Sequence, residues 1–260
     1  PVLVKWIEGP ITPADKQQFI RDAHIMSHLR HEHIVPFYGA CFEKDRMCIV
    51  TGVVDAPLLE CLSQLSQEER LIIGKDLASG LAYLHQHNVI HSDIHPNNIG
   101  IKRGEGKWLD LSWVKTTLSS LASVGIAHEI DVWQAPETWD QRHQVTPESD
   151  IYSLGWLLWT LTTGRLPFPD QSGPALHQAI QAGQRECFPN DCPPHIAKVI
   201  SGCWDPDPTK RPRLEDVIDQ LNNRLFLHHL PPPQGRCIMT KARQRSRQGT
   251  SQRHWIVIPT

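Results

Sequence analysis

The stretch that decides the fold is His91-Ser92-Asp93-Ile94-His95-Pro96-Asn97-Asn98. It follows an amphipathic run, 71–84, that predicts a helix, and it precedes a short β-like run. Titratable and amide side chains gathered between two regular elements are typical of a functional loop. A further carboxylate, Asp110, follows twelve residues after Asn98.

Other short motifs accompany this loop in a fixed order. They are Lys5 near the start, then Ala135-Pro136-Glu137, Asp150 with Gly155, Cys203-Trp204-Asp205-Pro206, and Arg211-Pro212. Each motif alone is a weak signal. Together they make residues 1–227 resemble the protein kinase fold, from its third strand to its last helix. The motif around Cys203 resembles the tyrosine-kinase-like group.

This resemblance implies an α+β, bilobal fold. We expect a small mixed β/α lobe at 1–54, a larger, mainly helical lobe at 55–229, and a basic, disordered tail at 230–260. The small lobe would be incomplete, because the chain starts only four residues before Lys5 and would lack the first two strands. Its sheet would then have an unpaired edge.

The residues themselves support this division. Val2–Ile7 is β-branched and predicts a strand, and Thr12-Pro13 is a helix-start signal before an apolar 3.6-residue period. The runs 34–41 and 47–54 predict two more strands. Ser66 and Glu69 predict a capping box at the start of a long helix. The run 150–163 is apolar nearly all round, so we expect a buried helix that ends at Gly164, and a last helix from Arg213 to about Leu227.

The resemblance also assigns the site. Lys5 would hold the α- and β-phosphates of ATP, Asp22 would hold Lys5, and Asp93 would accept the proton of the substrate hydroxyl. Mg²⁺, which prefers oxygen ligands, would be held by Asn98 and Asp110. Glu137 would pair with Arg211 to brace the larger lobe, and Asp150 would support the loop around Asp93.

The run Ile49–Val54 looks like the hinge between the lobes. Thr51 would be the gatekeeper, and the backbones of Gly52 and Val54 would meet the adenine. Leu3 stands where a small alanine is usual above the adenine, and Gly100 stands where a large apolar residue is usual below it. A large roof over an empty floor would shift the bound adenine.

Several positions depart from the family pattern. Asp22 replaces glutamate, Ser92 replaces arginine, and Ser112 replaces the glycine of the Asp-Phe-Gly motif. His95 stands where serine/threonine kinases usually carry a lysine that steadies the γ-phosphate, and an imidazole is a weaker cation at neutral pH.

The four residues with a direct role in binding phosphate, binding metal or accepting the proton are nevertheless present. They are Lys5, Asp93, Asn98 and Asp110. The sequence therefore favours a protein kinase, active in signal transduction, that transfers the γ-phosphate of MgATP to a protein hydroxyl. Serine or threonine is favoured over tyrosine because Pro96 stands two residues before Asn98. The alternative is a catalytically weak or inactive pseudokinase that acts as a binding scaffold.

Composition sets further limits. The net charge is −2, but residues 231–260 carry six basic and no acidic side chains. Seven scattered cysteines without a C-x-x-C pair fit a reducing compartment, the cytoplasm or nucleus. The longest apolar stretch is too short to span a bilayer. We interpret the basic run Arg243–Arg247 as a solvated linker, so we expect no nucleic-acid partner. The alternative hypothesis is nuclear import or binding of RNA or anionic lipid, and the segment Trp255–Ile258 could dock onto a lobe.

Overall fold

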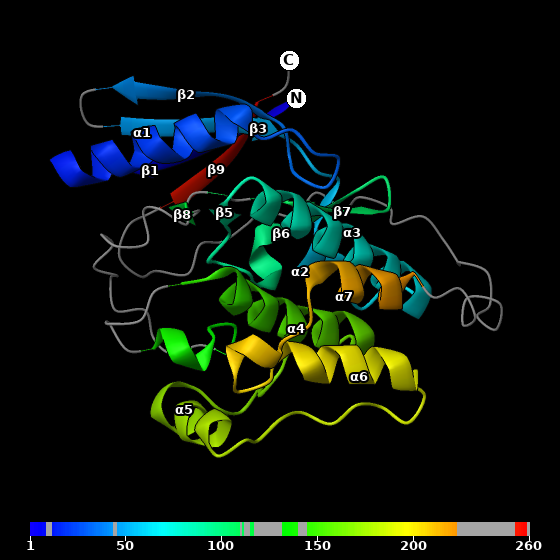
Figure 1. The fold of residues 1–260 in the computed structure, drawn as a ribbon. Coiled ribbons are helices and arrows are strands. Elements are labelled where there is room, and N and C mark those ends of the chain that lie inside the picture. The colour runs from blue at the N-terminus through cyan, green and yellow to red at the C-terminus, as the bar shows by residue number, and fades with distance from the viewer. Residues whose placement is uncertain are drawn as a thin grey trace.

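The computed structural model describes residues 1–8, 12–43, 46–109, 111, 115–116, 132–139, 145–222 and 253–258. Figure 1 shows a small lobe built on a β-sheet and a larger, mainly helical lobe stacked beneath it. This is the bilobal α+β architecture that the sequence predicts.

The small lobe is an antiparallel sheet covered by one helix. Strands β1 (Val2–Glu8), β2 (Phe37–Glu43), β3 (Arg46–Gly52) and β9 (Arg253–Ile258) lie in the order β2-β3-β1-β9. Helix α1 (Pro13–His28) buries Phe19 and Met26, which are seven residues apart and so share one face. The predicted helix after Thr12 is therefore confirmed.

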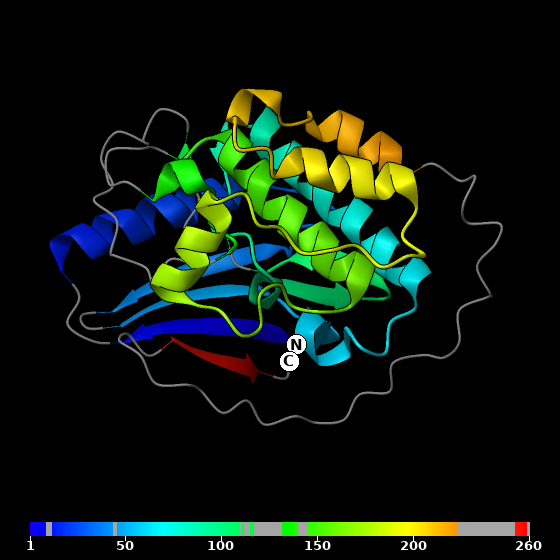
Figure 2. The same ribbon diagram turned by 90° about the horizontal axis from the view of Figure 1, so that it is seen from below.

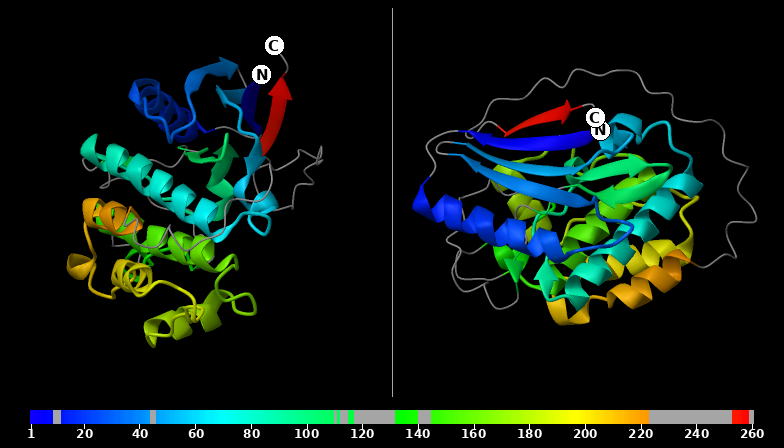
Figure 3. Two further views of the ribbon diagram at one scale, coloured as in Figure 1. Left: turned by 90° about the vertical axis from the view of Figure 1, so that its right-hand side faces the viewer. Right: turned by 90° about the horizontal axis from the view of Figure 1, so that it is seen from above.

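Strand β9 comes from the C-terminal tail (Figure 3). It runs antiparallel to β1, with a register from Val2 opposite Ile258 to Ile7 opposite Arg253. Our expectations of a disordered tail and an unpaired sheet edge are wrong for these six residues. The backbone N–H and C=O groups along the free edge of β1 need partners, and a β-branched segment of the chain itself supplies them.

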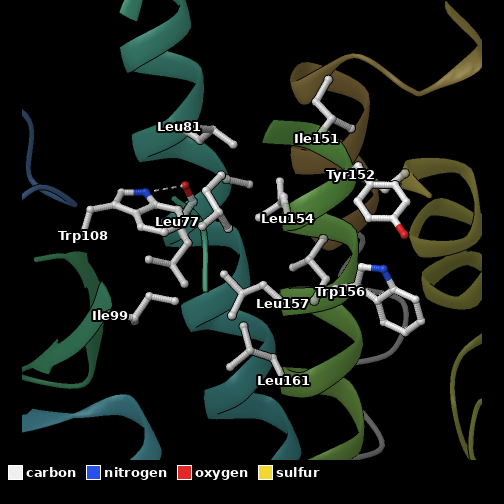
Figure 4. Close-up of a cluster of buried hydrophobic side chains, with 14 of the residues drawn as sticks. Leu77, Leu81, Ile99, Trp108, Ile151, Tyr152, Leu154, Trp156, Leu157 and Leu161 are labelled. Atoms are coloured by element: carbon white, nitrogen blue, oxygen red, sulfur yellow. Dashed lines mark hydrogen bonds between the residues drawn. The ribbon is translucent and has the colours of Figure 1, made fainter. Parts of the chain in front are cut away.

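The larger lobe is organised around two long helices, α3 (Gln67–Gln86) and α4 (Pro147–Thr163), which pack on each other. Every residue of α4 from Ser149 to Thr162 is buried, so this helix is the hub of the lobe. Figure 4 shows its leucines facing α3, and the Trp108 indole donating to the Leu77 carbonyl oxygen at 3.0 Å.

Both long helices begin with a capping box, and the sequence predicts the first of the two. The Ser66–Glu69 capping box is present, with the Ser66 N–H donating to Glu69 Oε2 at 2.8 Å. Helix α4 starts three residues earlier than expected, because Thr146 and Ser149 form a second capping box. It ends at Gly164, whose φ of 69° suits glycine.

Shorter elements complete the lobe (Figure 2). The helices are α2 (Leu58–Cys61), α5 (Gly173–Gln181), α6 (Pro194–Cys203) and α7 (Leu214–Leu221), and the 3₁₀ turns are Pro96–Asn98, Pro136–Thr138 and Pro208–Lys210. Helices α5 and α6 are additions to the sequence prediction and lie furthest from the small-lobe sheet (Figure 1). The predicted extension of the last helix from 223 to 227 lies outside the described residues.

Two small sheets lie beneath the small lobe. One has the order β4-β6-β7, from β4 (Ala56–Pro57), β6 (Ile99–Lys102) and β7 (Glu105–Trp108). The other pairs β5 (Val89–Ile90) with β8 (Lys115–Thr116). Because β5 and β6 flank residues 91–98, these sheets fix both ends of the polar loop. Within the ranges described, no helix is long and apolar enough to cross a membrane.

The pairing of β9 with β1 makes a testable prediction. Replacing both Trp255 and Ile256 by proline should break it, because neighbouring strand residues point their N–H groups to opposite sides and one of the two must face β1. We expect the amide protons of Val2–Ile7 to exchange with solvent at least about tenfold faster in hydrogen-exchange mass spectrometry.

The control is the double alanine variant at the same positions, which keeps both N–H groups. Equal exchange of β1 in the wild-type protein and the double proline variant would show that β9 does not cover this edge in solution.

Candidate active site

The loop 91–98 is held from below by a buried carboxylate, that of Asp150 at the start of α4. Asp150 Oδ2 accepts the His91 N–H at 2.8 Å, and Oδ1 accepts the Ser92 N–H, also at 2.8 Å. His85 Nε2 lies 2.8 Å from Oδ2. These contacts hold Ser92 at a φ of 59°, a left-handed backbone that a serine adopts only under constraint. The predicted support of the loop by Asp150 is thus confirmed.

Asp93 and Asn98 are brought together inside the loop. The Asn98 side-chain Nδ2 donates to the Asp93 backbone oxygen at 2.8 Å and to Asp93 Oδ2 at 2.9 Å. With its NH₂ group committed to Asp93, the amide oxygen of Asn98 is the atom left for another partner. Asn98 itself is buried, so this orientation is fixed.

His95 lies on the other side of the Asp93 carboxylate, with Nε2 at 3.4 Å from Oδ1. Burial acts to raise the pKa of Asp93, but hydrogen bonding to His95, the charges of His95 and His91, and the Asn98 contact outweigh it. The resulting pKa is lowered to about 2. Asp93 is therefore ionised at every pH near neutrality.

The small lobe contributes a buried cation and a buried anion. The side chains of Lys5 on β1 and Asp22 on α1 are both almost fully buried, and Gln18 Nε2 donates to Asp22 Oδ1 at 2.6 Å. Charges are buried in proteins when they are paired or hydrogen-bonded. The expected ion pair between Lys5 and Asp22 stays a prediction.

The hinge segment comprises the end of β3 and the two residues after it. Thr51 is buried, and its hydroxyl has no hydrogen-bond partner among the described residues. The Gly52 N–H is already used, since it donates to the Pro36 oxygen at 2.9 Å. A side chain at Gly52 would press on the Pro36 ring, because a Cβ there would lie 2.8 Å from its Cγ.

Our expectation of an empty floor at Gly100 is wrong. A Cβ atom at Gly100 would lie 2.6 Å from Val54 Cγ2 and 2.8 Å from Leu109 Cδ2. Two aliphatic side chains from neighbouring segments therefore fill the space that a larger residue would occupy. Val54 and Leu109 thus take the place of the missing side chain, as expected in a protein interior where close packing leaves few voids.

A salt bridge braces the larger lobe, as expected. Arg211 Nη1 and Nη2 donate to the two carboxylate oxygens of Glu137 at 2.6 and 2.9 Å. The same guanidinium donates to the backbone oxygens of Asp205 and Glu148 and lies over the Tyr152 ring. Such forked pairing ties the segment after Ala135 to the helical lobe.

Two predicted positions, Asp110 and Ser112, lie outside the described residues. A feature that the sequence did not reveal is a groove of about 310 Å³ beside the loop, lined by His95, Pro96, Leu59, Trp133 and Leu166. The groove is marked by two large apolar side chains that are exposed to solvent, Leu59 and Leu166.

The structure thus holds Asp93 and Asn98 together in one loop and buries Lys5 on β1. Residues 1–221 match the family described as protein tyrosine and serine/threonine kinase. The chain belongs to this protein kinase family.

Individual relatives agree. The chain is 33% identical over 231 residues to the serine/threonine-protein kinase CTR1 of Arabidopsis thaliana, covering 83% of this chain and 27% of that protein. It is 29% identical over 219 residues to the serine/threonine-protein kinase STY17 of the same plant, covering 79% and 37%. It is 27% identical over 231 residues to the tyrosine-protein kinase Fer of Rattus norvegicus, covering 85% and 28%. The chain thus spans well under half the length of these relatives.

The contacts of Asp93 make a prediction about its titration. Replacing His95 by glutamine removes the largest source of stabilisation of the Asp93 carboxylate, so its pKa should rise from about 2 towards the ordinary value near 3.9. Carboxyl-carbon NMR with labelled aspartate measures this midpoint.

Because its pKa is lowered in the folded protein, the ionised Asp93 carboxylate stabilises the fold. The contribution of Asp93 to folding is complete above the unfolded-state value and is lost as the pH falls through about 2. The matched control is His87→Gln, which changes an exposed histidine at the end of α3. An Asp93 midpoint that is the same in the wild-type and His95→Gln proteins would contradict the role given to His95.

Proposed function

We propose that this kinase domain is catalytically active and transfers the γ-phosphate of MgATP to a hydroxyl of a protein substrate, serine or threonine rather than tyrosine. The observation that carries the proposal is the state of Asp93, an ionised carboxylate that lies between the Asn98 amide and the His95 ring. Phosphoryl transfer needs positioning and charge stabilisation more than covalent chemistry.

Asp93 would orient the substrate hydroxyl and accept its proton. A carboxylate with a pKa of about 2 is a weak base, so its main contribution is orientation, with proton transfer completed late in the reaction. His95, 3.4 Å from the same carboxylate, would face the transferred phosphate when it is protonated.

The residues present fit MgATP. Because the NH₂ group of Asn98 is committed to Asp93, its amide oxygen would be the atom that binds Mg²⁺, which prefers oxygen ligands. Asp110 would be the second ligand. The buried Thr51 hydroxyl at the hinge has no hydrogen-bond partner among the described residues, so it is a polar atom available to a bound nucleotide. When bound, MgATP supplies the phosphoryl group, and Lys5 would hold the α- and β-phosphates.

The apolar groove beside His95 supports a protein substrate. Leu59, Trp133 and Leu166 form a surface next to the base on which an extended peptide can place an apolar side chain. Two plant relatives are named serine/threonine-protein kinases, which supports serine or threonine as the residue that accepts the phosphate. The relative Fer, in contrast, is named a tyrosine-protein kinase.

The second candidate function is a binding scaffold without turnover. The observation that favours it is a set of exchanged residues. Ser92 and His95 in the loop, and Asp22 on α1, stand where arginine, lysine and glutamate are usual. A scaffold of this kind would bind nucleotide or a partner and transfer nothing.

Turnover separates the two candidates. With radiolabelled MgATP and myelin basic protein, we expect phosphate incorporation by the wild-type chain and a loss of about a thousandfold in the Asp93→Asn variant, which changes charge and not size. Lys16→Gln, on the exposed face of α1, is the matched control and should keep the wild-type rate. Equal rates for the wild-type and Asp93→Asn proteins would refute the proposal.

A further inference from the structure

A second pocket lies behind the hinge, away from the catalytic loop. Its volume is about 410 Å³, within the range of about 300–1,000 Å³ typical of ligand sites. One wall is the connector from α1 to β2, residues 29–36, and the other is the hairpin of β6 and β7. No proposed catalytic residue lines it.

The floor of this rear pocket is aliphatic and its rim is cationic. Leu29, Ile34 and Val35 are buried and Val53 is half-buried. Arg30 stands on one wall, and Lys102 and Arg103 stand on the hairpin opposite. A ligand would therefore meet an apolar surface below and positive charge from two sides.

The other charged groups of the rear pocket do not neutralise the positive charge of this rim. Lys107 is already committed, since its Nζ donates to the Glu32 backbone oxygen and to Glu105 Oε2, both at 2.6 Å. The Arg30 guanidinium donates to the backbone oxygen of Leu29, which carries no charge to neutralise it. With Lys107 set against Glu105, three cations of the lining face the carboxylate of Glu32, and Asp55 adds a second carboxylate beside Arg103.

His31 adds no charge at neutral pH. Burial, and the neighbouring His33, lower the pKa of its imidazole below the ordinary value near 6.5. Its ring lies against Tyr83, with centroids 4.9 Å apart. The lining includes no tryptophan, tyrosine or phenylalanine, so a nucleotide base finds no free aromatic face.

Arg103 is held in a strained conformation at the tip of the hairpin. Its φ is 55°, and Gly104 follows with a φ of 82°. Two left-handed residues in a tight turn favour the sequence Asn-Gly. Asp55 Oδ2 accepts the Arg103 N–H at 2.7 Å and fixes this geometry. Strain of this kind concentrates where a side chain has a function, here a long cation over the pocket.

We propose that the rear pocket docks an acidic peptide segment of a partner protein, in which two carboxylates flank an aliphatic side chain. The aliphatic side chain packs on Ile34, Val35 and Val53. One carboxylate meets Arg30, and the other meets Lys102 and Arg103. Docking here brings a partner to the domain without occupying the cleft around Asp93.

The test uses the full 260-residue chain and a fluorescein-labelled Gly-Glu-Leu-Glu peptide, with Gly-Gln-Leu-Gln as its neutral counterpart. Fluorescence anisotropy at low ionic strength should show binding of the acidic peptide and at least about tenfold weaker binding of the neutral one. The methyl NMR signals of Ile34, Val35 and Val53 should shift on binding.

Two variants locate the interaction. Arg103→Asn and Lys102→Gln should each weaken binding of the acidic peptide about fivefold. Arg103→Asn should fold at least as stably as the wild-type protein, because asparagine adopts a positive φ more easily. The control is Arg213→Gln, an exposed arginine before α7 on the larger lobe, which should leave binding unchanged.

Several results would overturn the proposal. They are equal binding of the neutral peptide, an effect of Arg213→Gln as large as that of Arg103→Asn, or unmoved methyl signals. Competition by inorganic phosphate at the same concentration as the acidic peptide would assign the pocket to a small anion instead.

Discussion

The site depends on one buried carboxylate. Asp150 is 1% exposed, and it receives two backbone N–H groups from the loop and lies 2.8 Å from His85. Burying a charge is costly unless hydrogen bonds satisfy it. The two loop N–H groups depend equally on Asp150, because without it they would be left without a hydrogen-bond acceptor. Its place in the first turn of α4 adds a favourable interaction with the helix N-terminus. The left-handed Ser92 and the position of Asp93 follow from this contact.

The rest of the larger lobe gives Asp150 a fixed platform. Helix α4 is buried along almost its whole length, with Trp156 packed on Trp204 at 4.3 Å between ring centroids. The forked pair of Arg211 and Glu137 ties a second segment to the same helix through the Glu148 oxygen. The hydrophobic hub therefore supplies rigidity, and the carboxylate transmits it to the loop that carries the chemistry.

Short-range sequence patterns were enough to predict the two long helices and the residues of the polar loop. Helices α3 and α4 are long, strongly apolar on one or all faces, and capped by side chains that the sequence displays. The loop residues Asp93 and Asn98 and the brace of Glu137 with Arg211 follow from an ordered set of motifs. Helices α5 and α6 begin without a side-chain cap and span only nine and ten residues, and short helices without a capping side chain are harder to predict from the sequence.

Features that arise from distant parts of the chain were harder to predict. The pairing of β9 with β1 joins the two ends of the sequence, and a β-branched run does not name its partner. The filling of the space at Gly100 depends on Val54 and Leu109, which only the fold brings there. The rear pocket likewise combines the connector after α1 with a hairpin some seventy residues later.

We infer that Asp150, through its two loop N–H contacts, positions an ionised Asp93 for phosphate transfer. The steady-state kinetics of the Asp150→Asn variant with MgATP and a protein substrate test this role most directly. Asparagine can accept only at one oxygen, so the account predicts a fall in kcat of at least about tenfold with the KM for ATP nearly unchanged. A variant with the kcat of the wild-type protein would contradict it, because the loop would then hold Asp93 without the carboxylate.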